Sequence, residues 1–205
     1  MEGLQNKNPL RNPEYIIAFS VALISICALF VSIRQTIIMS EQRALMHEQA
    51  KASVWPRIGL GVGKSHSVED QSINNYQIRV TNAGVGPAII KDVRLLYKGE
   101  EITNWWNLFD AFEMSDSIPT YVTNSRISKN IIRQGESLRI LSLKENLQLA
   151  QVFFENSDQI RIDIIYESIY GDQWKYTTSL TGKGESTEEV IPSIEEFDTE
   201  KSFKN

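Results

Sequence analysis

The spacing of apolar positions changes once along the chain, near Pro56, and this change divides the sequence into two kinds of structure. Residues 15–33, YIIAFSVALISICALFVSI, form an apolar run without a charge. A helix of this length spans roughly 28 Å, close to the hydrocarbon thickness of a bilayer. The apolar core of a signal peptide is shorter, about 7–15 residues, and a buried helix of a soluble protein is the other alternative. We predict a transmembrane helix over residues 15–33, preceded by a polar segment, residues 1–14.

The helical pattern is expected to continue past the apolar run. Residues 34–53 contain no Gly or Pro and are rich in helix formers, so we predict a helical stalk. Ile38, Leu45 and Ala52 recur every seven residues, which favours a short coiled coil. Pro56 ends the helix, because the residue before a proline is pushed toward extended geometry.

Beyond Pro56 the apolar positions alternate with polar ones, as in half-buried strands. The alternating sets are Tyr76, Ile78 and Val80; Ile89, Val93, Leu95 and Tyr97; Ile160, Ile162, Ile164 and Tyr166; and Trp174, Tyr176, Thr178 and Leu180. Gly171-Asp172 predicts a tight hairpin, and the turn at Gly135 leads into another strand. Six or seven strands joined by short turns indicate a mainly β fold, a β-sandwich or small barrel over residues 54–181.

Two inserts between the strands, residues 104–114 and 144–156, have helical or irregular patterns. In the second insert Leu147, Ala150 and Phe154 lie at helical intervals. We expect both inserts to be short additions to the sandwich.

Charge is concentrated at one end of the chain. Residues 182–205 carry seven acids against three lysines, which is −4 of the net charge of −5. Because this segment also lacks periodicity, we predict an acidic disordered tail. The near-neutral body lacks the basic bias of a double-stranded nucleic-acid binder. The one cysteine, Cys27, allows neither an intrachain disulfide nor a thiol cluster for a metal.

Basic residues flank the apolar run on both sides, with a slight excess after it. Two basic side chains, Lys7 and Arg11, precede the run together with the amino terminus, whereas three, Arg34, Arg43 and Lys51, follow it. By the positive-inside rule, the C-terminal domain is expected in the cytoplasm. The prediction is a single-pass protein of the cell inner membrane.

The segment TNAGVGPAIIKDV, residues 81–93, raises the question of a phosphate-binding loop. Such a loop leads into a helix whose N–H groups face the anion, and it carries a Lys-Ser/Thr pair. Here the pattern after the loop is that of a strand, and the pair is absent. Asn82 and Gly84 tolerate positive φ, and Pro87 fixes the entry to the strand. We interpret Asn82, Gly84, Gly86 and Pro87 as a structural bend.

The same residues carry a resemblance. Asn82, Gly84, Gly86, Pro87 and Ala88 form the motif N-x-G-x-G-P-A, Gly135-Glu136-Ser137 forms a second turn, and Trp55-Pro56 precedes the domain. Over residues 54–181 the chain resembles uncharacterised bacterial single-span membrane proteins with an immunoglobulin-like β-sandwich of the CARDB type. The resemblance implies binding or assembly rather than a conserved reaction.

Residues with catalytic potential are few. His47 lies on the stalk, and His66 lies in KSHSVED beside Glu69 and Asp70. A Ser-His-acid triad in one loop would need a geometry that adjacent residues seldom take, together with an oxyanion hole. Cys27 lies in the apolar run and is interpreted as a small apolar residue. We therefore predict no catalytic residue, no metal ligand, no cofactor and no enzymatic activity.

Aromatic residues in the first insert suggest a ligand platform. Aromatic stacking combined with cationic groups holds nucleotides and single strands. The candidate ligand-binding residues are Trp105, Trp106, Arg126 and Arg133, with Phe109, Phe112 and Lys129 nearby. The alternative, which we favour, is that these rings plug one end of the sandwich core.

The apolar run also carries a stripe of small and hydroxylated residues. Ala18, Ala22, Ser25, Leu29, Ser32 and Thr36 follow a 4-3-4-3-4 spacing and lie on one helix face. Such residues permit close helix approach in a membrane, so we predict a homo-oligomer seam there. A random distribution of small residues is the alternative.

Two functions fit these features. The first is a membrane-anchored, non-enzymatic binding or sensing module that presents its sandwich at the membrane to a small-molecule or protein ligand. The alternative is an oligomeric pore-forming effector gated by its soluble domain, an architecture that resembles bacterial anti-phage effectors in nucleotide-signalling systems.

Overall fold

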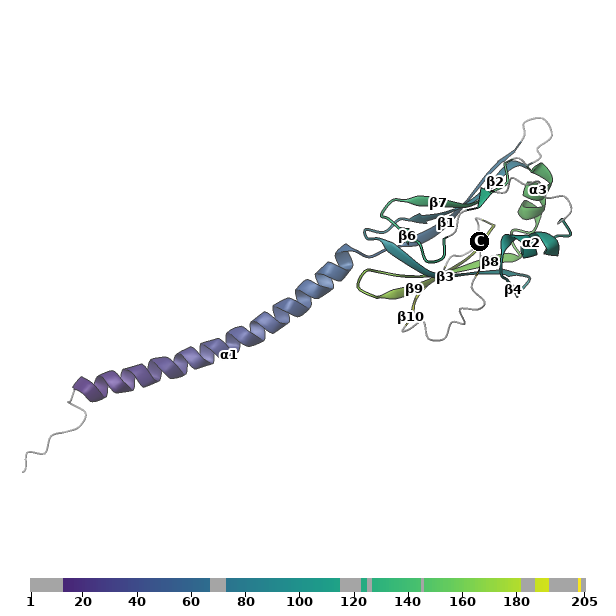
Figure 1. The fold of residues 1–205 in the computed structure, drawn as a ribbon. Coiled ribbons are helices and arrows are strands. Elements are labelled where there is room, and N and C mark those ends of the chain that lie inside the picture. The colour runs from purple at the N-terminus through teal and green to yellow at the C-terminus, as the bar shows by residue number, and fades with distance from the viewer. Residues whose placement is uncertain are drawn as a thin grey trace, which may run out of the picture. The chain divides into compact units, whose positions relative to one another are not determined.

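The structure is a computed structural model of residues 1–205 (Figure 1). It describes residues 13–66, 73–114, 123–124, 127–144, 146–181, 187–191 and 203. The chain forms two compact units, residues 1–50 and residues 51–205. Each unit is described by itself.

The first unit consists of one helix, α1 (Pro13–Ser53), whose last residues belong to the second unit. The helix runs without a break through the predicted membrane segment and the predicted stalk, so helical structure over residues 15–53 is confirmed. None of its residues is buried. In the part of the chain that the structure describes, α1 is the one helix long and apolar enough to cross a membrane. Glu14 in its first turn and Lys51 in its last turn complement the helix dipole.

The second unit is built from two antiparallel sheets. The first sheet has the order β1 (Ile58–His66), β2 (Ile73–Asn82), β7 (Ser137–Ser142), β5 (Thr123–Asn124). The second has the order β10 (Thr187–Ile191), β9 (Gln173–Ser179), β8 (Ile160–Glu167), β3 (Ala88–Tyr97), β4 (Glu100–Ile102), and β6 (Ile131–Ile132) pairs with β3. This arrangement agrees with the predicted helix followed by a β-sandwich.

Side chains from both sheets meet in one core. Ile78 and Val80 of β2 and Ile162 and Ile164 of β8 are almost fully buried, as their alternation predicts. Two short helices, α2 (Trp105–Ala111) and α3 (Leu147–Glu155), lie at the end of the sandwich opposite the linker, residues 54–57 (Figure 1). The predicted helical inserts are therefore confirmed.

The predicted inward face of β3 is wrong at one residue. Ile89 was grouped with Val93, Leu95 and Tyr97, but a register shift against β8 lies between Ile90 and Asp92. Ile90 is fully buried and Ile89 only half-buried. A bulge inserts one extra residue into the strand. The inward-facing positions are therefore even-numbered up to Asp92 and odd-numbered from Val93 onward.

The predicted inward face of α3 is also displaced. The buried residues are Leu149, Ala150 and Phe153, whereas Leu147 is exposed. The Asn146 side chain caps the helix by accepting a hydrogen bond from the Leu149 N–H at 3.0 Å. With this start, the Phe153 ring packs against Tyr76 of β2 at 5.7 Å between centroids.

The strand count was underestimated. The described residues between 54 and 181 contain nine strands, not six or seven. The strands that the alternating sets and the turn at Gly135 do not predict are β1 and the short strands β4, β5 and β6, which have two or three residues each. A period of two cannot be recognised in so short a segment.

The predicted disordered tail over residues 182–205 is wrong for both parts of it that the structure describes. Residues 187–191 form β10, which pairs with β9. Phe203 is buried in the core, where its N–H donates to the Val93 carbonyl oxygen at 2.8 Å. Its ring contacts the Trp105 ring edge-on at 5.0 Å. The remaining residues of the segment lie outside the described part.

Phe203→Ala is expected to lower the free energy of unfolding by about 3–5 kcal/mol, because it removes a buried ring beside Trp105 and leaves a cavity. Urea unfolding followed by circular dichroism measures the change. Phe203→Leu keeps most of the apolar volume and serves as the control with a smaller loss. Equal stability of Phe203→Ala and the unmodified protein would contradict the buried placement.

Candidate functional site

The buried side chain of Asn82 connects three segments at one end of the sandwich. Its Oδ1 accepts hydrogen bonds from the N–H groups of Arg57 at 3.1 Å and Gly84 at 3.0 Å. Its Nδ2 donates to the carbonyl oxygens of Gly86 at 2.7 Å and Ile132 at 2.9 Å. The amide therefore uses all four of its hydrogen-bonding positions. It joins the linker, the glycine loop (residues 83–87) and β6.

Three N–H groups of the glycine loop, those of Ala83, Gly84 and Val85, are already in use. Those of Ala83 and Val85 donate to the carbonyl oxygens of Arg57 at 2.8 Å and Trp55 at 2.9 Å. That of Gly84 donates to Asn82, as described above. Because these groups are paired and the loop continues into β3 rather than into a helix, it offers no cradle for a phosphate. The interpretation of the segment as a bend agrees with this geometry.

The expectation of positive φ at Asn82 and Gly84 is wrong. Among the described residues the glycines with positive φ are Gly99, Gly135 and Gly171, so neither Gly84 nor Gly86 has this conformation. Instead, a Cβ on Gly84 would overlap the backbone of Trp55, Pro56 and Arg57. A Cβ on Gly86 would overlap the carbonyl group of Val54. These glycines allow the linker backbone to lie directly against the loop.

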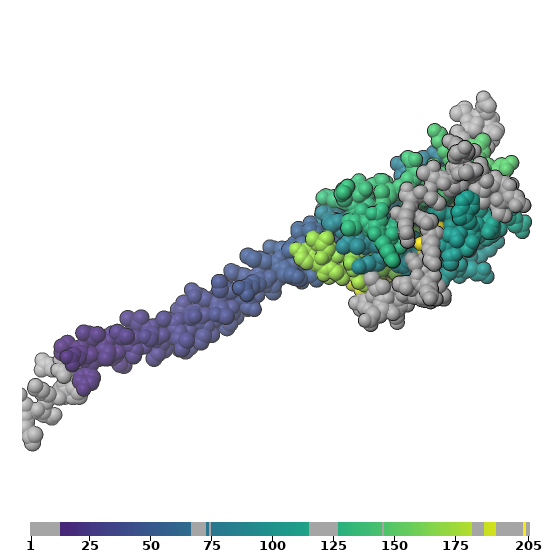
Figure 2. Space-filling view, viewed as in Figure 1, coloured from purple at the N-terminus to yellow at the C-terminus, as the bar shows by residue number. Residues whose placement is uncertain are grey.

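The last turn of α1 also contacts the sandwich through an ion pair. Lys51 forms an ion pair with Asp172 in the β8–β9 hairpin at 2.9 Å between Nζ and Oδ1. In the space-filling view the light-green hairpin lies against the blue end of the helix (Figure 2). Pro56 is buried. The residues between the helix and β1 are thus all attached to the second unit.

Aromatic rings form a stack beside the linker. Trp55 stacks on Trp174 of β9, with centroids 6.3 Å apart and planes 23° from parallel. Trp174 in turn stacks on Tyr166 of β8 at 5.6 Å and 25°. Tyr166 is buried and Trp174 nearly so, whereas Trp55 remains 53% exposed. The stack therefore ends in an indole ring that is open to solvent.

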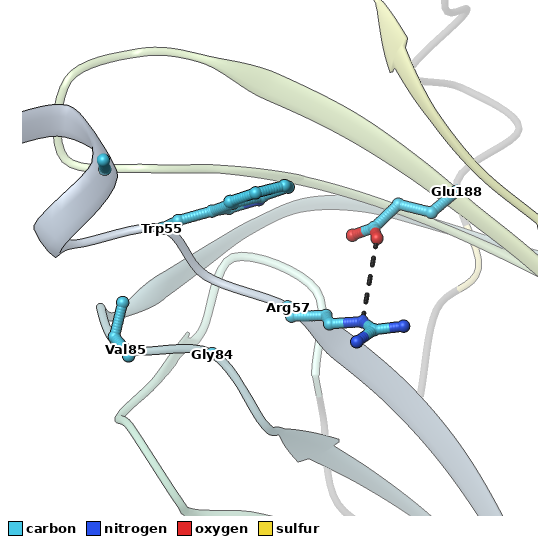
Figure 3. Close-up of a pocket in the computed structure, with 6 residues that line it drawn as sticks. Trp55, Arg57, Gly84, Val85 and Glu188 are labelled. Carbon is cyan, nitrogen blue, oxygen red and sulfur yellow. Dashed lines mark ion pairs between the residues drawn. The ribbon is translucent and has the colours of Figure 1, made fainter. Parts of the chain in front are cut away.

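This indole ring forms one wall of a pocket of about 470 Å³, which we call the junction pocket. Its lining residues are Ala52 of α1, Trp55 and Arg57 of the linker, Gly84 and Val85 of the glycine loop, and Glu188 of β10. Trp55 and the Gly84–Val85 backbone lie on opposite sides of the space, and Glu188 points toward Arg57 (Figure 3). The volume is in the range of small-molecule sites.

Two charged groups lie at one end of the junction pocket. Arg57 Nε and Glu188 Oε2 are 4.0 Å apart, and the Tyr166 hydroxyl donates a hydrogen bond to Glu188 Oε1. The Arg57 side chain is 73% exposed and that of Glu188 24%. Burial raises the pKa of the Glu188 carboxyl above its ordinary value of 4.5, and the Arg57 guanidinium partly offsets the rise. A carboxyl with a perturbed pKa inside a pocket makes the pocket a candidate functional site.

Trp105 and Trp106, two of the residues predicted to bind a ligand, lie in different environments. Trp105 is 2% exposed and packs against Phe153 and Phe203 in the core. Trp106 is 52% exposed on α2. Because Trp105 has no face open to solvent, its placement agrees with the alternative that the insert plugs the sandwich.

Arg126 lies outside the described residues. Arg133 is exposed in the turn between β6 and β7, where its N–H donates to Glu136 Oε2 at 2.8 Å. Neither residue can be assigned to a site with Trp106 from the described contacts.

The predicted seam residues all lie on α1 and are exposed. Ser25 and Thr36 donate their hydroxyl hydrogen bonds to the carbonyl oxygens of Val21 at 2.8 Å and Ser32 at 3.0 Å within the same helix. These hydroxyls are therefore satisfied without a second helix. The seam stays a prediction.

The histidine loop is only partly described. His66 ends β1 and its ring contacts the Phe154 ring edge-on at 6.1 Å, while Glu69 and Asp70 lie outside the described residues. Cys27 is exposed on α1. In the described ranges no group of three or more His, Cys, Asp or Glu side chains is arranged to hold a metal ion.

No protein-family model matches the chain, and no curated protein matches it. The junction pocket is therefore interpreted from its own chemistry.

Sequence reasoning missed the residues of the junction pocket. Trp55 was singled out only as part of the Trp-Pro pair, and Glu188 was assigned to a disordered tail. The sequence signal that could have identified Trp55 is an aromatic residue beside a proline at the change of period. Glu188 has no local signal, because β10 is a short strand rich in acids.

Gly84→Ala and Gly86→Ala are each expected to lower the free energy of unfolding by about 1–3 kcal/mol, because the added Cβ overlaps the linker backbone. Chemical denaturation measures both changes. Gly61→Ala on β1 is the matched control, since a Cβ there meets nothing within 4 Å. Losses as small as that of the control would show that the linker does not contact the loop.

Glu188→Gln is expected to leave the melting temperature at pH 7 unchanged or to raise it. The amide still accepts a hydrogen bond from Tyr166, but it removes a carboxylate whose ionisation burial disfavours. The pKa of this carboxyl is higher in the folded protein than in the unfolded chain. As pH falls through the folded-state pKa, the folded protein binds a proton that the unfolded chain does not yet bind, so the fold becomes more stable. This gain is complete below the pKa of the unfolded chain. The advantage of Glu188→Gln should therefore shrink between pH 7 and about 4.5.

Thermal unfolding across this pH range measures the effect. Glu189→Gln, which removes a neighbouring carboxylate on the same strand, is the control. A lower melting temperature for Glu188→Gln at pH 7 would show that attraction to Arg57 outweighs the effect of burial.

Proposed function

We propose that the protein is a membrane-anchored, non-enzymatic binding module whose ligand site is the junction pocket. One observation carries this proposal: the pocket is lined jointly by the last turn of α1, the linker, the glycine loop and β10. A ligand there would contact the end of the anchoring helix and the sandwich at the same time. This arrangement suits a sensing function in which a ligand bound in the junction pocket contacts the last turn of α1.

The anchor in this proposal is the apolar part of α1. Large apolar side chains along it are exposed, among them Phe19, Leu23, Phe30 and Ile33. An apolar surface of this extent is unfavourable in water and favourable in a bilayer. We place the second unit on the cytoplasmic side of the inner membrane, since Arg34, Arg43 and Lys51 outnumber the basic residues before the run.

About 30 Å of helix separates Ile33 from Ser53 at 1.5 Å per residue. We propose that the junction pocket binds a soluble ligand or partner. Its lining side chains include no hydroxyl, thiol or imidazole group, and we propose binding without a reaction.

The immunoglobulin-like assignment belongs to the same proposal. What supports it is the pair of antiparallel sheets and the packing of the N-x-G-x-G-P-A bend against the linker. The Gly135-Glu136-Ser137 turn lies beside Asn82, because the Gly135 N–H donates to the Asn82 carbonyl oxygen at 2.9 Å. The two motifs of the resemblance thus form one structural feature.

A photo-crosslinking amino acid at position 85 tests the binding function. Val85 lines the junction pocket and is 53% exposed, so its replacement should capture the native ligand in cell membranes. The expected result is an intact-mass shift of the purified protein that decreases in the Glu188→Gln background. The control is the same replacement at Ile131, which is equally exposed on β6. Identical adducts at both positions, or none at position 85, would contradict the proposal.

A further inference from the structure

The aromatic stack beside the linker ends at the Trp55 indole, whose exposed surface can stack against one more planar group. Trp174 stacks with both Trp55 and Tyr166, and the rings of both pairs are nearly parallel. Trp55 contributes the exposed end of this series and lines the junction pocket. A planar ligand on this indole would continue the stack, which is a favourable arrangement for nucleobases.

The junction pocket has the form of a slot. The Trp55 side chain is seen edge-on in Figure 3, with the Gly84–Val85 backbone across the open space from it. An indole face and a peptide backbone are walls that a flat molecule can contact on both of its faces. The side chain of Val85 adds an apolar contact at the rim of the slot. The Trp55 indole and the Gly84–Val85 backbone therefore favour flat, unsaturated ligands.

The end of the slot is occupied by a hydrogen-bond acceptor held in a fixed position. Glu188 Oε1 accepts from the buried Tyr166 hydroxyl, which orients the carboxylate. An ionised carboxylate accepts hydrogen bonds through both oxygens and donates none. It therefore matches a ligand edge that presents two adjacent N–H donors.

The guanidinium of Arg57 supplies the opposite charge. Its separation of 4.0 Å from Glu188 is at the limit of an ion pair, and most of the side chain is exposed. Little is therefore lost if Arg57 turns from Glu188 toward an anionic group of a ligand. A guanidinium is well suited to phosphate, because its N–H groups match the phosphate oxygens.

We propose that the junction pocket binds a guanine nucleotide, with the base stacked on Trp55, its N–H edge on Glu188 and its phosphate on Arg57. Guanine presents N1–H and the N2 amino group side by side, which are two donors for one carboxylate. Adenine places an acceptor nitrogen beside its amino group, so a carboxylate is repelled at that position. This inference rests on the proposed binding function and specifies its ligand.

Calorimetric titration of the full-length protein in nanodiscs with GMP, AMP and guanosine tests the proposal. GMP should bind at least about tenfold more tightly than AMP, the discrimination typical of a paired hydrogen-bonding edge. Guanosine should bind more weakly than GMP, because it has no phosphate for Arg57. Equal affinities of GMP and AMP, or no heat with GMP at millimolar concentration, would overturn the proposal.

Two pairs of variants separate the contacts. Glu188→Gln should abolish the preference for GMP over AMP, whereas Glu189→Gln on the same strand should keep it. Trp55→Ala should weaken GMP binding about tenfold or more through lost stacking, whereas Trp106→Ala, an exposed tryptophan on α2, should leave it unchanged. Trp55→Phe, which retains an aromatic face, should fall between Trp55→Ala and the unmodified protein.

Failure of this proposal can be told apart from failure of the binding function. A crosslinked adduct at position 85 that contains no guanine would keep the binding function and overturn the guanine assignment. Unchanged GMP affinity in both Glu188→Gln and Trp55→Ala would place any nucleotide binding outside the junction pocket, and would overturn it as well.

Discussion

The buried amide of Asn82 is the interaction on which the junction between α1 and the sandwich depends. Four backbone groups from the linker, the glycine loop and β6 are satisfied by this one side chain. In a buried site each would otherwise lack a partner, which is costly. Gly84 and Gly86 complete the arrangement by leaving space for the linker backbone. The linker is therefore held by hydrogen bonds and close backbone contact rather than by side-chain packing alone.

The junction pocket is a consequence of this attachment. Asn82 and Ala83 hold Arg57 through the backbone, and Val85 holds Trp55 in the same way. Both side chains are thereby presented to one space, across from a loop that cannot carry side chains at Gly84. The glycine loop, which resembles a phosphate cradle in sequence, thus shapes a pocket without using its N–H groups for a ligand.

Glu188 combines opposing effects in this region, because it accepts a hydrogen bond from Tyr166 and lies near Arg57 while its carboxylate is partly buried. Its carboxylate is partly buried, and its ionisation is disfavoured by burial more than it is favoured by Arg57. A carboxyl with a perturbed pKa in a pocket is a candidate for a binding role. The Tyr166 hydroxyl orients it, so the aromatic stack and the acceptor are parts of one structure.

Local patterns in the sequence determined the long helix, the turns at Gly135 and Gly171, and the longer strands other than β1, because periodicity and turn chemistry are properties of neighbouring residues. They did not determine the bulge at Ile90, the start of α3 at Asn146 or the short strands, which depend on pairing and capping. The conformation of Gly84 and Gly86, the burial of Phe203 and the meeting of Trp55 with Glu188 were decided by the tertiary structure alone. Each of these depends on a contact between segments far apart in the chain, and no local pattern records which distant backbone will lie against a glycine or which strand edge will receive a carboxylate.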